Sequence, residues 1–379
     1  MSLQVHHRSD AKGRDLAMVA AAFTVALNVL GPCPALAQGW EDRTSGGVTA
    51  HLYVPGGPNG SQRGLLVVLH GCSQSNTVLR DLGSFEGAAQ DFDLVVALPA
   101  VPDGGVLLGC WDYYGSDHTR SNRHSGPVLD FVDGLLDDDE LRIDPGRVAV
   151  AGLSSGAGMA LVLACLAPDV FSGVAAVAGP AVGTDAMQIL SVSVTADEAR
   201  ETCRSLAGDQ ADWFDSQRAV IVAGTGDFIV AQGYAPLNAE VFAGLYNSNG
   251  PLSASDLDVA SLDGYEPRGQ GTVWSDGTTQ RIALILVDGM GHAWPAGSGP
   301  GGETSYVASE GPSLASFLGE FFGDGEAEAP DDRPHEEEGS DLVHDGGCRV
   351  APSRSTRGND IGLALLLGVI AAMVLRRGR

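Results

Sequence analysis

Ser154 is the central serine of GLSSG (152–156), a G-x-S-x-G pattern in which that residue could act as a nucleophile. Because the chain has 52 glycines in 379 residues, the match alone could arise by chance, and its neighbours must decide. An apolar run, RVAVAG (147–152), precedes the serine, and a helix of small residues is expected from about Gly156 to Leu166. A strand, a sharp turn and a helix in this order expose a serine hydroxyl for attack on an acyl group. The pattern therefore predicts Ser154 as the nucleophile of an acyl-transfer site.

A serine nucleophile needs a base and an acid, and two later turns offer them. RAVIVAGTGDFIV (218–230) is an apolar strand that runs into a glycine-rich turn with Asp227, and RIALILVDGMGHAWP (281–295) does the same with His292. Both side chains follow strand carboxyl ends, where the sites of parallel sheets are built. We expect His292 to take the proton from Ser154 and Asp227 to orient the imidazole.

Other acids and histidines of the domain have simpler interpretations. Asp288 lies only four residues before His292, so it is expected to be a turn residue at the strand end. His118 and His124 are expected in a polar loop. His70 is expected to be a turn residue that makes a hydrogen bond.

An acyl-transfer site also needs two hydrogen-bond donors for the oxyanion. The backbone N–H of Ser155, directly after the nucleophile, is the first candidate. The second is expected in the turn LHGCSQS (69–75), at the N–H of Cys72. This chemistry requires no cofactor and no metal, and we expect neither.

Six cysteines are present, of which Cys33 and Cys348 lie near the two ends of the chain. The other four allow three pairings, and export to an oxidising compartment makes disulfides the expected state. Free buried thiols are the alternative. We favour the pairs Cys72–Cys110 and Cys165–Cys203.

The elements that must position these residues have the pattern of a parallel sheet. The strongly apolar stretches at 63–69, 94–100 and 147–152 are typical of strands that are covered on both faces. Between the last two, residues 126–147 have helical periodicity, and Asp144-Pro145-Gly146 is expected to end that helix.

The charge excludes one class of partner. The formal net charge is −26, and ten acids lie between Asp324 and Asp345. Phosphate binding needs a basic surface, so no nucleic-acid partner is expected.

Both ends of the chain are expected to lie outside the catalytic domain, which we place at 38–323. Residues 1–37 have a basic start, an apolar run and an A-x-A site, which predict a signal peptide. Residues 324–347 form an acidic linker, and 348–379 contain Gly-Cys, an apolar run at 361–375 and a terminal arginine cluster. That tail resembles bacterial C-terminal sorting signals of the myxobacterial type, which implies processing by a sorting protease at the cell surface. A membrane-inserted tail anchor is the alternative.

Several quoted stretches together resemble one family. LHGCSQS, CWDYY, IDPGRVAVAGLSSGAGMA, APDVFSGVAAVAG, DGMGHAWPAG and SYVASEGPSLASFLGEFF occur in order over about residues 40–323. They look like the secreted poly(3-hydroxyalkanoate) depolymerase and esterase family, which includes feruloyl and acetylxylan esterases. The resemblance implies an α/β-hydrolase fold, with a mostly parallel central sheet and helices on both faces. It also implies a Ser154-Asp227-His292 triad, with the amides of Cys72 and Ser155 at the oxyanion.

The substrate is less sharply defined. Poly(3-hydroxybutyrate) or its oligomers are the first expectation, and feruloyl or acetyl esters of plant polysaccharides are the second. Trp111, Tyr114 and Trp294 are candidate walls for an acyl or aryl group, with ordinary core packing as the alternative. A catalytically inactive hydrolase fold that acts as a surface binding protein is a further possibility.

Overall fold

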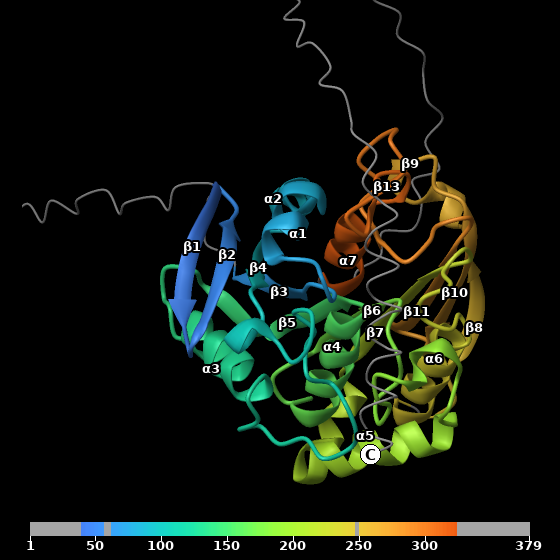
Figure 1. The fold of residues 1–379 in the computed structure, drawn as a ribbon, viewed down its shortest axis with the longest axis horizontal. Coiled ribbons are helices and arrows are strands. Elements are labelled where there is room, and N and C mark those ends of the chain that lie inside the picture. The colour runs from blue at the N-terminus through green and yellow to red at the C-terminus, as the bar shows by residue number, and fades with distance from the viewer. Residues whose placement is uncertain (1–38, 57–61, 247–249, 324–379) are drawn as a thin grey trace, which may run out of the picture. The chain divides into compact units, whose positions relative to one another are not determined.

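The computed structural model describes residues 39–56, 62–246 and 250–323, and a ten-stranded sheet runs through this part (Figure 1). Apolar β-prone residues fill its central strands, and all seven residues of the RGLLVVL strand are buried. In spatial order the strands are β1 (Gly39–Ser45), β2 (Val48–Val54), β4 (Leu94–Pro99), β3 (Arg63–Leu69), β5 (Ile143–Leu153), β6 (Gly173–Val177), β7 (Arg218–Gly224), β11 (Gln280–Val287), β10 (Gly269–Ser275) and β8 (Ser253–Leu257).

The six central strands, from β4 to β11, run parallel to one another. Antiparallel strands flank them: β1 and β2 on one side, β10 and β8 on the other. The prediction of a mostly parallel sheet is therefore confirmed. Because the central strands point the same way, the turns that follow β3, β5, β7 and β11 meet along one carboxyl edge.

Helices cover both faces of the sheet, as predicted, and each face has its own apolar core. Figure 1 shows α1, α2 and α7 on one side of the strands and α3 to α6 on the other. The first group is α1 (Asn76–Leu82), α2 (Phe85–Asp91) and α7 (Leu314–Phe322). The second group is α3 (Ser125–Leu136), α4 (Ser155–Leu166), α5 (Ala196–Ala207) and α6 (Tyr234–Leu245).

Local sequence accounts for several helix starts. α5 begins with a capping box, in which Thr195 accepts the N–H of Glu198 while the Glu198 carboxylate accepts the N–H of Thr195. Ser75 caps α1 by accepting the N–H of Val78. α4 is different, because all twelve of its residues are buried and most are small or apolar. It therefore packs closely against the sheet directly behind Ser154.

The helix expected over 126–147 is shorter than predicted, because α3 ends at Leu136. The acids at 137–140 come next, and negative charge is unfavourable at the negative end of the helix dipole. Asp138 instead accepts the N–H of Glu140 and pairs with Arg43 of β1. The chain turns here and enters β5 at Ile143, before the Asp-Pro-Gly sequence that was expected to end the helix.

Both favoured disulfides are present. Cys165–Cys203 ties α4 to α5, and Cys72–Cys110 ties the turn after β3 to the loop before α3. Each bond joins residues 38 positions apart in the sequence. The pairs thus restrain two separate loops of equal length.

The expected signal peptide at 1–37, the acidic linker at 324–347 and the tail at 348–379 lie outside the described residues, as does the apolar run at 361–375. Within the described ranges, none of the helices has the length and apolar character needed to span a membrane.

Replacing Cys165 and Cys203 by serine is expected to lower the free energy of unfolding by roughly 3–4 kcal/mol, the chain-entropy estimate for a loop of about this length. Urea unfolding with linear extrapolation measures this value. Cys72→Ser with Cys110→Ser is the matched control, because its loop has the same length, and a similar loss is expected. An unchanged stability in both variants would contradict a restraining role for these bonds.

Candidate active site

Ser154 lies in a strained turn between β5 and α4. Its backbone has φ 58° and ψ −117°, which non-glycine residues rarely adopt. The turn is very tight: a Cβ added at Gly152 would lie 2.3 Å from the carbonyl carbon of Gly156, and one at Gly156 would lie 2.2 Å from the carbonyl oxygen of Leu69. The two glycines are therefore required by close backbone packing. This is the geometry of a nucleophile elbow.

Asp227 and His292 form a buried pair. Nδ1 of His292 donates to Oδ2 of Asp227 at 2.8 Å. The other carboxylate oxygen, Oδ1, accepts the backbone N–H groups of Ile229 at 2.8 Å and Val230 at 3.1 Å. The carboxylate is thus fixed on both sides, and Nε2 of His292 is the ring nitrogen left for proton exchange. Asp288, the rival acid, is exposed at the strand end, in agreement with the turn role expected for it.

Backbone hydrogen bonds join the turns that carry these residues. The Ser154 turn is linked to β6, β6 to β7, and the Asp227 turn to the His292 turn. A Cβ added at Gly224 would lie only 2.0 Å from the carbonyl oxygen of Met290, so the last two turns are in direct contact. The bonds are Ser154 N to Val177 O (2.9 Å), Ala178 N to Val222 O (2.8 Å), Thr225 N to Val287 O (2.9 Å) and Gly226 N to Met290 O (2.9 Å).

The structure thus brings the three expected residues to one sheet edge, although it does not complete the set of side-chain bonds. Among the hydrogen bonds of the described residues, none joins the hydroxyl of Ser154 to the ring of His292. That contact stays a prediction.

The two expected oxyanion donors flank Ser154. A Cβ added at Gly71 would lie 3.5 Å from Cβ of Ser154, which brings the turn after β3 against the serine. In that turn the Cys72–Cys110 bond and a hydrogen bond from Ser73 N to Leu108 O (2.7 Å) hold the backbone. Within the described chain, the N–H groups of Cys72 and Ser155 have no hydrogen-bond acceptor from the protein. Neither N–H group is therefore paired within the described protein, as an oxyanion donor requires.

Gln74 is a site residue that the sequence interpretation missed. Its Oε1 accepts the N–H of Gly71 at 3.0 Å, and its Nε2 donates to the carbonyl oxygen of Ser305 at 3.0 Å. The next residue, Tyr306, lies edge-on to the His292 ring, with centroids 6.1 Å apart. Gln74 thus connects the turn after β3 with the segment that covers the histidine. The stretch LHGCSQS contains this glutamine, but its partner lies 231 residues away, so no local pattern could reveal the contact.

A small three-stranded sheet supports the histidine turn. It consists of β12 (Trp294–Pro295), β14 (Val307–Ala308) and β13 (Glu303–Thr304). The carboxylate of Glu303 accepts the N–H of Gly291, directly before His292. The backbone directly before His292 is therefore held by β13, a strand outside the histidine turn.

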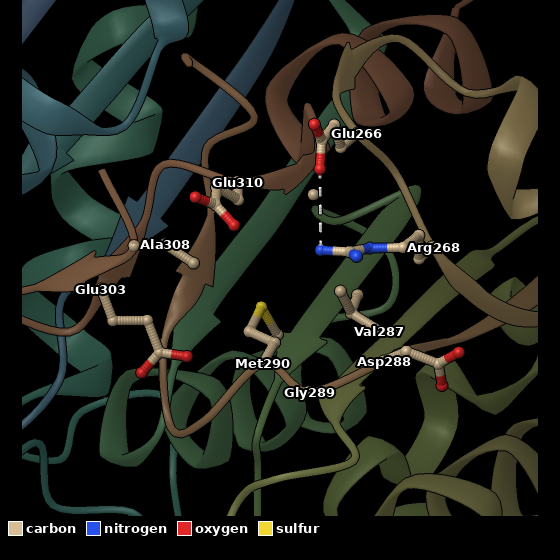
Figure 2. Close-up of a pocket in the computed structure, with 11 residues that line it drawn as sticks. Glu266, Arg268, Val287, Asp288, Gly289, Met290, Glu303, Ala308 and Glu310 are labelled. Carbon is tan, nitrogen blue, oxygen red and sulfur yellow. Dashed lines mark ion pairs between the residues drawn. The ribbon is translucent and has the colours of Figure 1, made fainter. Parts of the chain in front are cut away.

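A cavity of about 350 Å³ lies beside this turn (Figure 2). Its charged lining residues are Glu266, Arg268, Asp288, Glu303 and Glu310, and the Glu266–Arg268 ion pair spans 3.9 Å. Its described lining includes neither Ser154 nor His292. Anywhere in the described ranges, no three or more His, Cys, Asp or Glu side chains are grouped so that they could hold a metal ion. The cavity is thus adjacent to the histidine turn but separate from the expected reaction centre.

The expected aromatic walls are largely core residues. Trp111 and Trp294 have no exposed surface, so the core-packing alternative holds for both. Trp111 lies between the rings of His70 and His124, and Trp294 packs against Phe85. Their burial depends on the neighbouring elements, which the sequence around each tryptophan does not specify.

Tyr114 is the one expected wall residue with partial exposure. Its ring packs against Tyr113 with centroids 4.5 Å apart, and burial raises the pKa of its phenol to about 12. It is neutral at physiological pH and can offer an apolar face. Tyr114 therefore remains a candidate substrate contact.

The remaining histidines have structural positions. His118 and His124 lie in a loop, as expected, but both are buried, and Nδ1 of His124 accepts the N–H of Asp112 at 2.8 Å. Their burial was not expected, and the His124 ring packs against Trp111. His70 is a buried turn residue as expected, with Nδ1 2.9 Å from the Gly71 carbonyl oxygen. Burial lowers its pKa, which favours the neutral ring.

Comparison with known proteins by sequence gives one family and two relatives. Residues 48–256 match the family model described as esterase PHB depolymerase. The chain is 37% identical to a poly(3-hydroxybutyrate) depolymerase of Ralstonia pickettii, over 71% of this chain and 57% of that protein. It is 26% identical to poly(3-hydroxyalkanoate) depolymerase C of Paucimonas lemoignei, over 68% of this chain and 63% of that protein. The chain thus spans less than two thirds of either relative.

A solved acetyl xylan esterase from Aspergillus awamori aligns with a TM-score of 0.54 and 19% identity, covering 67% of this chain and 94% of that one. This similarity shows a shared α/β-hydrolase fold.

Gly224→Ala is expected to separate the Asp227 turn from the His292 turn, because the new methyl group would collide with the Met290 carbonyl. The low-field proton resonance of the His292 Nδ1–H should then shift or disappear in NMR spectra. Gly87→Ala is the control, because a Cβ there meets nothing within 4 Å in α2. An unchanged resonance in Gly224→Ala would show that the two turns do not depend on this contact.

Proposed function

Because this chain belongs to the esterase PHB depolymerase family, we propose that it is a serine carboxylic ester hydrolase that works through an acyl-enzyme. The observation that carries the proposal is the combination of the strained Ser154 elbow with the buried Asp227–His292 pair at 2.8 Å. A serine with a base and an acid at one sheet edge is suited to acyl transfer. The inactive binding-protein alternative would not need this pair to be kept together.

In the proposed reaction, Oγ of Ser154 attacks the ester carbonyl carbon and gives its proton to Nε2 of His292. The Cys72 and Ser155 amides donate to the oxyanion that forms. The carbon–oxygen bond to the alcohol then breaks, and His292 returns the proton to the leaving alkoxide. Water repeats the sequence on the acyl-enzyme and releases the carboxylic acid and free Ser154.

Asp227 has a supporting role in this scheme. Its carboxylate accepts the Nδ1–H of His292, which keeps Nε2 toward the substrate and stabilises the imidazolium that forms. The two N–H groups on its other oxygen keep the carboxylate from rotating.

The proposed substrate is poly(3-hydroxybutyrate) or its oligomers. The 37% identical relative from Ralstonia pickettii bears that substrate in its name, and this similarity supports the assignment. Feruloyl or acetyl esters of polysaccharides remain the second candidate for the same site.

The proposed location is outside the cytoplasm, with residues 38–323 as the catalytic domain. Two disulfides fit an oxidising compartment. The proposed signal peptide, acidic linker and sorting or anchoring tail complete this picture.

A fluorophosphonate probe is expected to label the full chain, and Ser154→Ala is expected to abolish labelling and ester hydrolysis together. Ser155→Ala, which keeps the backbone amide, is the matched control and should still be labelled. Absence of labelling in the wild-type protein would favour a binding protein over an enzyme.

A panel of soluble esters tests the substrate class. 3-Hydroxybutyrate oligomers are expected to be hydrolysed with a kcat/KM at least about tenfold above that for methyl ferulate or acetylated xylan oligosaccharides, a difference of roughly 1.4 kcal/mol in transition-state binding. The reverse order would move the enzyme to the polysaccharide esterases while leaving the serine mechanism in place.

A further inference from the structure

Four of the large apolar side chains that are exposed to solvent come from two segments at the acid side of the site. We name them the apolar rim. Single exposed apolar residues are ordinary, but a group beside an active site indicates an interaction surface. The rim consists of Met187, Leu190, Val192 and Phe228, which are 40%, 52%, 43% and 72% exposed.

The two segments of the rim are held together. The N–H of Ala231 donates to the carbonyl oxygen of Ile189 at 2.8 Å. The hydroxyl of Tyr234, at the start of α6, donates to the carbonyl oxygens of Gln188 at 2.8 Å and Ser191 at 3.2 Å. Residues 188–190 form a short 3₁₀ helix, η2 (Gln188–Leu190), on this support. The rim is therefore a built surface rather than two independent loops.

The rim adjoins the reaction centre. Phe228 directly follows Asp227, and the next two N–H groups along the chain are those that bind the Asp227 carboxylate. On the other side, the N–H of Gly115 donates to the carbonyl oxygen of Thr184 at 2.9 Å, which brings the Tyr114 segment against the start of the rim segment. An occupant of the rim would thus lie beside the segments that carry Asp227 and Tyr114.

The rim lies in stretches with little charge, although the chain as a whole is strongly acidic, with a net charge of −26. Residues 186–196 and 228–239 contain no Asp, Glu, Lys or Arg, and the exposed Asp185 at their border accepts the N–H of Met187 at 2.8 Å. Contact with an uncharged apolar surface would therefore desolvate no ionised side chain within the two stretches, provided that the Asp185 carboxylate stays in water. An anionic surface such as an acidic lipid bilayer would be repelled by the rest of the chain.

We propose that the apolar rim is an adsorption surface for a solid, uncharged aliphatic polyester, and that it brings the polymer surface to the serine site. This inference rests on the proposed function, because the occupant is the insoluble form of the proposed substrate. Burial of four half-exposed side chains against a polymer supplies the attraction. Binding to the polymer surface would then take place on the catalytic domain itself.

The test uses the full chain carrying Ser154→Ala, so that adsorption is measured without hydrolysis. Binding isotherms on poly(3-hydroxybutyrate) granules are compared before and after adding Met187→Gln and Leu190→Gln. The pair is expected to lower the affinity at least about tenfold, because two apolar contacts are lost. Trp213→Gln is the matched control: it is also 51% exposed, but it lies in η3 (Gly208–Asp215), which precedes β7 at the opposite edge of the sheet. Its affinity should be unchanged.

Three results would overturn the inference. Equal loss in the Trp213 control would show that any exposed apolar residue suffices. Equally tight binding to phosphatidylcholine vesicles would make the rim a lipid surface. Concentration-dependent dimerisation that the rim substitutions abolish would make it a contact between two copies of the chain.

The proposed function is tested separately by the same substitutions in the active enzyme. Hydrolysis of a soluble ester should be unchanged in the Met187→Gln/Leu190→Gln variant, whereas release of soluble products from granules should fall with adsorption. Inactivity of the parent enzyme toward every soluble ester would refute the proposed function. The granule-binding isotherms would still decide whether the rim adsorbs to the polymer, because they do not depend on hydrolysis.

Discussion

Backbone segments approach each other at the carboxyl edge of the central sheet so closely that no side chain fits between them. Gly156 lies against the β3 carbonyl groups, and Gly224 lies against the turn that carries His292. These contacts set how close the serine turn lies to the turn after β3, and how close the acid turn lies to the histidine turn. Every side-chain interaction at the candidate site depends on that spacing, because Asp227 reaches His292 only when their turns touch.

The spacing is maintained from both faces of the sheet. Behind the serine, the fully buried α4 packs directly on the strands, and its small residues permit the close approach. Around the histidine, the three-stranded sheet and Glu303 fix the backbone before and after the ring. Gln74 then joins the two regions through its amide. The site is therefore one connected set of turns, although its members come from widely separated parts of the chain.

Much of this arrangement could be predicted from the sequence, because it depends on local patterns. Apolar runs of strand length gave the parallel sheet, and GLSSG between a strand and a small-residue helix gave the elbow. Asp227 and His292 followed from their places after strands. The tryptophans could not be assigned in this way, because Trp111 and Trp294 are buried by elements far away in the sequence. The Gln74–Ser305 contact was missed for the same reason. The end of α3 was predicted too late, because the prediction followed the helical periodicity and gave too little weight to the unfavourable acids at 137–140.

The Cys72–Cys110 bond has a consequence for when the protein becomes competent. The bond clamps the turn that carries the proposed oxyanion donor at Cys72, and it forms only after two thiols have been oxidised. A chain in a reducing environment would lack this covalent clamp, and its turn after β3 would be held by hydrogen bonds alone, among them Ser73 N to Leu108 O. Under the proposed location outside the cytoplasm, formation of this bond and departure from the cell would coincide.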